Sequence, residues 1–124
     1  ELIKVPMPGY RIHIDGAFVM IDGDTAIVNI NELPYFFIEE LQRRKIRMIE
    51  LPPNDNAFSL NCLAVAPGRV IMHTSRTPRL SEALDKAGIT ILSLDYDCVE
   101  LGGGGIHCIT QQQPAGQALP QDVR

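Results

Sequence analysis

The chain has 124 residues, of which 45% are hydrophobic and 21% charged, and its formal net charge is −4. This length suits one domain with its own core. The small negative charge argues against nucleic acid as a partner, since the one basic run, Arg43-Arg44-Lys45, is typical of a solvated helix end. No apolar run approaches the roughly 20 residues that cross a bilayer, there is no signal-peptide pattern, and three cysteines make no disulfide framework, so we expect a reducing, cytoplasmic setting.

The first folded unit begins with two predicted strands, residues 17–21 and 25–30, joined by the tight turn Asp22-Gly23-Asp24. Residues 33–44 have a proline near their start and apolar residues at Phe37, Ile38 and Leu41, which favours a helix. Residues 46–51 follow as a strand. The unit is therefore β-β-α-β.

The same order is predicted a second time. Strands at 61–66 and 69–73 flank the turn Pro67-Gly68, a helix covers about 78–87 and ends at Gly88, and a strand covers 89–94. The two units correspond at an offset of 43 to 44 residues through the pairs Val19 and Leu63, Ile27 and Ile71, Leu41 and Leu84, and Ile46 and Ile89. Such a unit cannot bury its apolar faces alone, so we expect the repeats to pack against neighbours.

Partial units are predicted on either side. Residues 2–5 and a strand carrying His13 resemble the end of a preceding unit, and a strand through Cys108 resembles the start of a further one. The last residues, rich in Gln, Pro and Gly, have no core-forming pattern and are predicted to be a loose tail. The chain begins at Glu1 rather than at Met, as a piece of a longer protein would.

Two short segments point to chemistry. Gly102 to Gly105 are consecutive glycines, which cost backbone entropy unless close approach or positive φ is needed, and Cys108 follows them. A thiol on a rigid strand beside an open glycine loop suggests a nucleophile. Upstream, His13 and Asp15 would share one face if their segment is a strand.

Each of these three side chains also has a plainer interpretation. Cys108 could be a small buried hydrophobe, as free cysteines usually are. His13 could be a half-buried strand histidine, and Asp15 could cap the turn at Gly16. The coincidence of all three types in one chain favours a site.

Other polar residues are weaker candidates. Asn61 opens a repeat strand near the expected axis of the units, where it could contact a polar substrate. His107 would face away from Cys108 on a strand, either supporting the site or simply packed or exposed, with the latter slightly favoured. Cys62 and Cys98 are predicted to be core thiols, and His73 to be solvated at a strand end. The histidines lack metal-ligand spacing, so no metal is predicted.

Two motifs carry a resemblance to a known family. His13-Ile14-Asp15-Gly16-Ala17-Phe18 resembles the His-x-Asp segment of the pentein superfamily, and the segment 103–111, with Ile106-His107-Cys108 at its centre, resembles the family's cysteine motif. The similar members are the guanidine-modifying enzymes: arginine and agmatine deiminases, dimethylarginine dimethylaminohydrolases and amidinotransferases. The resemblance extends to about residue 113.

The resemblance implies an α/β propeller of five β-β-α-β modules, of which about two and a half are present here. Residues 1–113 would be the C-terminal part of the catalytic domain and 114–124 a flexible tail. Cys108 would attack the guanidinium carbon and His13 would act as acid and then base. Asp15, with Asn61 as a further polar contact, would bind the substrate, and Gly104 and Gly105 would let it approach. Further carboxylates would come from modules that precede this chain.

The same resemblance leaves alternatives open. Water as the second nucleophile gives a hydrolase, and an amine gives an amidinotransferase; neither requires a cofactor. One branch of the superfamily is non-catalytic, but it lacks the Cys/His pair that this chain keeps. An inactive fragment that self-associates through open edges is a further alternative, with a second copy or the missing N-terminal half as its partner.

Overall fold

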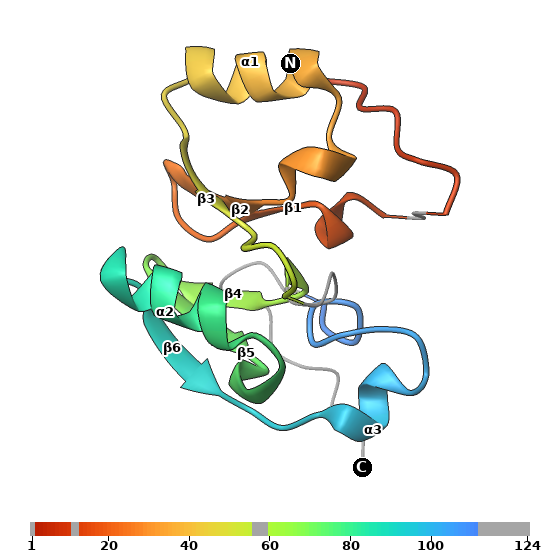
Figure 1. Cartoon of the computed structure of the whole chain (residues 1–124), viewed down its shortest axis with the longest axis vertical. Helices are drawn as coiled ribbons and strands as arrows, with labels where there is room; N and C mark the ends of the chain where they lie inside the picture. The colour runs from red at the N-terminus through yellow and green to blue at the C-terminus, as the bar shows by residue number, and fades with distance from the viewer. Residues whose placement is uncertain (1, 11–12, 56–59, 112–124) are drawn as a thin grey trace, which may run out of the picture.

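The computed structural model describes residues 2–10, 13–55 and 60–111 (Figure 1). The first half forms a three-stranded sheet of order β1-β2-β3, in which β1 and β2 are antiparallel and β2 and β3 are parallel. A helix, α1, connects the parallel pair. The elements of this half are β1 (Phe18–Met20), β2 (Thr25–Val28), α1 (Tyr35–Arg43) and β3 (Arg47–Glu50).

The second half repeats this topology in a sheet of order β4-β5-β6, with β4 and β5 antiparallel and β5 and β6 parallel. Its elements are β4 (Leu63–Ala66), β5 (Arg69–Met72), α2 (Pro78–Lys86) and β6 (Thr90–Ser93). Pro78 starts α2, where its missing N–H costs nothing, and Gly88 follows the helix with a φ of +83°, as predicted for a stop residue.

The two halves correspond residue by residue where the sequence predicts it. Val19 pairs with Ile27 across the first hairpin, and Leu63 pairs with Ile71 across the second. The helix ends match in the same way, because the N–H of Ile46 donates to the carbonyl of Leu41 and that of Ile89 to the carbonyl of Leu84. All four predicted pairs therefore occupy equivalent positions.

Strand β2 lies between two hydrophobic clusters, and all four of its residues are buried. Ala26 and Val28 pack under α1, which covers the face of the first sheet away from the second half (Figure 1). Ile27 faces the opposite way, into a cluster that also contains Val70 of β5 and Leu80 of α2. The expectation that the repeats bury their apolar faces against one another is confirmed.

The basic run at the end of α1 is exposed, as predicted. Arg43 and Arg44 both pair with Glu40 at 2.6 Å, and their hydrogen bonds lower the pKa of that carboxyl to about 2. No helix in the described part of the chain is long and apolar enough to cross a membrane.

The flanking segments differ from the prediction. His13 lies in a bend ahead of a short 3₁₀ helix, η1 (Ile14–Gly16), so it is not on a strand, and residues 2–5 are irregular. A short helix that the sequence did not indicate, α3 (Asp97–Glu100), follows β6. The expected tail at 114–124 lies outside the described residues.

Candidate active site

A cavity of about 500 Å³ opens where η1, the start of β4 and the glycine loop after α3 meet. It is lined by Tyr10, His13, Asp15, Gly16, Asn61, Val99, Gly102, Gly103, Gly104, Cys108 and Ile109. The predicted site residues His13, Asp15, Asn61, Gly104 and Cys108 therefore converge on one cavity from three separate parts of the chain, whereas Gly105 is not part of its lining.

Cys108 reaches the cavity from a turn and not from a strand. Residues 106–109 are in turn conformation, the N–H of Cys108 donates to the carbonyl of Gly105 at 3.1 Å, and the thiol is exposed. The prediction of a strand is wrong because this backbone bonds locally and to side chains instead of to a neighbouring strand. The alternative of a buried Cys108 is also excluded.

Asn61 is the residue that holds the site together. Its side-chain amide is buried and donates from Nδ2 to Cys108 Sγ at 3.0 Å and to Asp15 Oδ2 at 3.3 Å. Its Oδ1 accepts the backbone N–H of His107 at 2.8 Å. A buried amide with its donor and acceptor both engaged fixes the thiol and the carboxylate relative to each other.

The glycines of the loop meet different structural requirements. A Cβ built on Gly105 would overlap the side chain of Asn61, lying 2.6 Å from its Cγ, so close approach at this position is to the asparagine. A Cβ on Gly104 would lie 3.1 Å from the Cβ of Cys108. Gly103 has a φ of +88°, a conformation that other residues rarely adopt.

His107 contributes more than the sequence indicates. Its Nδ1 lies 3.0 Å from Asp15 Oδ2, and the same oxygen lies 3.9 Å from Cys108 Sγ. His107 is exposed, in line with the favoured expectation, but it also contacts the carboxylate of the candidate site, and its position next to Cys108 was the available signal. A turn, unlike a strand, allows neighbouring residues to contact the same carboxylate.

His13 and Asp15 do not share the face of a strand, because η1 begins directly after His13. Both nevertheless line the cavity, His13 from its exposed position and Asp15 from a partly buried one.

The two remaining cysteines differ in burial. Cys62 is fully buried, as predicted, and desolvation raises the pKa of its thiol to about 12. Cys98 is exposed on α3, so its prediction as a core thiol is wrong.

His73 is buried and is not solvated as predicted, because it packs edge-on against Tyr96 just before α3. The same burial raises the pKa of the Tyr96 phenol to about 12. His73 also lies beside two aspartates. Spacing in the sequence gave no sign of that cluster.

Comparison with solved structures finds the same fold in several enzymes at low identity. An inosamine-phosphate amidinotransferase from Streptomyces griseus matches with 23% identity and a TM-score of 0.65, covering 87% of this chain and 34% of its own. An amidinotransferase of saxitoxin biosynthesis from Microseira wollei matches with 19% identity and a TM-score of 0.69, with coverages of 89% and 33%. The chain has the fold of these enzymes.

A DDAH from Pseudomonas aeruginosa, solved with citrulline, also matches with 19% identity and a TM-score of 0.57, over 75% of this chain and 33% of its own. The predicted resemblance to the guanidine-modifying penteins is thus confirmed at the level of the fold. The chain spans about a third of the length of each of these structures. No family model matches the sequence, and no curated protein matches it significantly.

Proposed function

We propose that this chain carries the nucleophilic part of an enzyme that modifies an arginine-like guanidino compound through a covalent intermediate on Cys108. The observation that carries the proposal is the exposed Cys108 thiol, hydrogen-bonded by buried Asn61 and 3.9 Å from the Asp15 carboxylate at the cavity that His13 also lines. A nucleophile, a carboxylate and an imidazole at one opening are the groups that this chemistry needs.

The first step uses the charge of the substrate. A guanidinium bound at Asp15 would donate N–H groups to the carboxylate, a charge-assisted planar match, and would also stabilise a thiolate at Cys108. The sulfur then forms a bond to the guanidinium carbon. The bond from that carbon to the departing amine breaks as His13 gives the amine a proton, which leaves a thiouronium on the enzyme.

The second step releases the enzyme. His13, now neutral, takes a proton from water as the water oxygen bonds to the thiouronium carbon. The carbon–sulfur bond then breaks and Cys108 leaves as a thiolate, while the remaining hydroxyl proton passes to solvent to give a neutral ureido product. If an amine attacks in place of water, the same steps transfer the amidino group.

The rest of the enzyme would complete the fold and the grip on the substrate. Two β-β-α-β units and the flanking segments would belong to a five-module propeller, and carboxylates from the other modules would bind the far side of the guanidinium. A second copy or the preceding modules would cover the open edges. A reducing, cytoplasmic setting would keep Cys108 as a thiol.

The test is turnover by the protein that contains this chain, with arginine, methylated arginines and agmatine as substrates. Cys108→Ser should lower turnover by about a thousand-fold or more, because a hydroxyl is a far weaker nucleophile towards a guanidinium. Cys98→Ser removes the other exposed thiol and should keep full activity. Mass spectrometry after rapid acid quenching should find the thiouronium on the peptide that contains Cys108.

The products then distinguish the two reactions: a ureido compound indicates hydrolysis, and a new guanidino compound indicates transfer to the added amine. Full activity of Cys108→Ser would refute the nucleophile. Binding of these substrates without turnover or adduct would refute the enzyme and favour a binding protein.

A further inference from the structure

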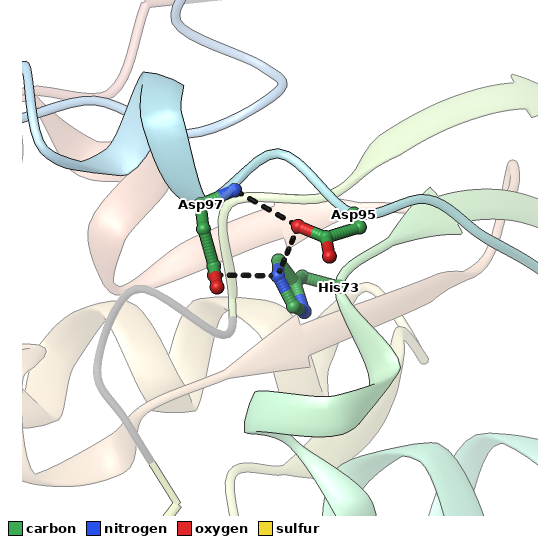
Figure 2. Close-up of side chains that lie close together, drawn as sticks. All are labelled: His73, Asp95 and Asp97. Carbon is green, nitrogen blue, oxygen red and sulfur yellow. Dashed lines mark hydrogen bonds and ion pairs between the residues drawn. The ribbon is translucent and has the colours of Figure 1, made fainter.

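A second cluster of ionisable side chains lies outside the proposed active site, between the end of β5 and the start of α3 (Figure 2). His73 points from the end of β5 towards Asp95 and Asp97, which flank Tyr96. His73 Nε2 lies 2.8 Å from Asp97 Oδ1 and 3.3 Å from Asp95 Oδ1. One ligand atom from each residue lies within 4.8 Å of the other two.

The imidazole nitrogen of this cluster lacks a hydrogen-bond partner. The His73 side chain is only 6% exposed, yet Nε2 makes no hydrogen bond to any described residue. Both aspartate oxygens are near enough to Nε2 for a hydrogen bond, so the direction excludes one. The oxygens lie off the axis on which Nε2 carries its proton or lone pair. A buried nitrogen left in this way is costly unless another group occupies that axis.

The other ring nitrogen is engaged. His73 Nδ1 lies 2.9 Å from the hydroxyl of Ser75. When Nδ1 donates its proton to that hydroxyl, Nε2 carries the lone pair and faces two carboxylate oxygens with no proton between them. Histidines that bind metals are commonly held in this way, with the second nitrogen donating to a neighbouring oxygen.

We propose that His73, Asp95 and Asp97 bind a divalent cation, with Zn²⁺ as the ion best suited to one imidazole and two carboxylates. Zinc lies about 2.0–2.2 Å from such ligands, so neighbouring ligand atoms of a tetrahedral site are roughly 3.3–3.6 Å apart. The separation from Nε2 to Asp95 Oδ1, 3.3 Å, meets that range, whereas the one to Asp97 Oδ1, 2.8 Å, is shorter, so the Asp97 carboxylate would move outward on binding the ion. The off-axis oxygens are the arrangement that an ion on the axis would require.

The charge of the surroundings favours a dication. Asp95, Asp97 and nearby Glu100 are carboxylates, whereas Arg76 is the guanidinium that pairs with them, at 2.8 Å from Asp97 and 3.6 Å from Glu100. With a neutral imidazole, the cluster carries two net negative charges, which one divalent ion would neutralise. Arg76 and His73 both contact Oδ1 of Asp97, so ion binding would change the position of the Asp97 carboxylate between these two side chains.

The position of the cluster links it to the cavity. Asp97 is the first residue of α3, and Val99 and Gly102, which follow it, line the cavity that contains Cys108. An ion held by His73 at the end of β5 would therefore tie α3 and the start of the glycine loop to the second sheet. Its effect on the proposed chemistry would be through the cavity wall, away from the reacting groups.

Metal binding is best measured on untagged protein in a Cys108→Ser background, because the Cys108 thiol near His107 and Asp15 could bind zinc itself. Titration calorimetry with Zn²⁺ should show one site per chain, and Co²⁺ in its place should give a visible absorption band. Asp95→Asn should weaken binding at least tenfold. Asp85→Asn, an exposed aspartate on α2, is the matched control and should leave binding unchanged.

Zinc binding should also raise the melting temperature of the Cys108→Ser protein, and this rise should be clearly smaller in Asp95→Asn at the same zinc concentration. The variant should keep the metal-free stability because Asp95 is exposed. Absence of saturable binding would overturn the proposal. So would binding that survives both Asp95→Asn and His73→Gln. In either case the cluster would be an ion pair between a protonated His73 and Asp97.

Discussion

Replacement of Gly105 by alanine tests the claim that buried Asn61 organises the site. The new Cβ would lie 2.6 Å from Asn61 Cγ and 2.8 Å from its Cβ, so the buried asparagine side chain, only 3% exposed, would have to leave its present position. Overpacking of this kind costs about 1–3 kcal/mol. Displacing the amide also breaks its bonds to Cys108 Sγ and to the His107 N–H, at about 1 kcal/mol each.

The free energy of unfolding of Gly105→Ala should therefore fall by about 3–5 kcal/mol, measured by urea denaturation, with a loss of roughly 10–20 °C in Tm. Gly23→Ala is the control, because nothing lies within 4 Å of its Cβ position, and it should change stability by less than about 1 kcal/mol. The φ of Gly105 is not positive, so backbone strain cannot produce the effect. Wild-type stability in Gly105→Ala would refute the role of Asn61.

Two further predictions concern the core. Leu80→Ala should lower the free energy of unfolding by about 2–5 kcal/mol, because Leu80 is fully buried between the two sheets, and Leu101→Ala, 89% exposed, should change it little. Cys62, whose pKa burial raises to about 12, should escape iodoacetamide at pH 8.5 in native protein and react after denaturation, as peptide mass spectrometry would show; native labelling would contradict its burial. Because the fold favours the protonated form of Cys62, this residue contributes to the free energy of unfolding. The contribution is complete below about pH 8.5 and is lost as the pH rises towards 12.

The repeated units were predictable because their signals are local. The turns at Asp22-Gly23 and Pro67-Gly68, the helix start at Pro78 and the stop at Gly88 each depend on a few neighbouring residues. Strand β2 was predictable for the same reason, since an apolar run suits a strand buried on both faces. The observed strands are shorter than predicted, because hydrogen-bonded pairing and not residue propensity decides where a strand begins and ends.

The candidate site was predictable in its residues but not in its geometry. His13 lies between two isoleucines and Cys108 lies two residues after Ile106 and next to Ile109, which suggests strands, yet one residue precedes a 3₁₀ turn and the other lies in a turn. The competing interactions are long-range: the bonds of Asn61 to Asp15 and to the loop join residues more than 40 positions apart. No window of sequence contains both partners of such a bond.

His73 and Cys98 were mispredicted for a related reason. The burial of His73 depends on Tyr96, which precedes α3, a helix too short to leave a periodic pattern. Once α3 is in place, it covers the histidine and leaves Cys98 on its outer side. A single missed helix thus changed the environment of both residues.

The position of Asn61 explains how a loop can hold a reactive thiol without a strand of its own. Its chain neighbours, Leu60 and Cys62, are both fully buried in the cluster that the two sheets share. The asparagine backbone is therefore fixed by core packing, and its amide extends that rigidity to Cys108 and to the His107 N–H. The glycines can then supply space and a positive φ without making the thiol mobile, because its position is set from the core and not from the loop.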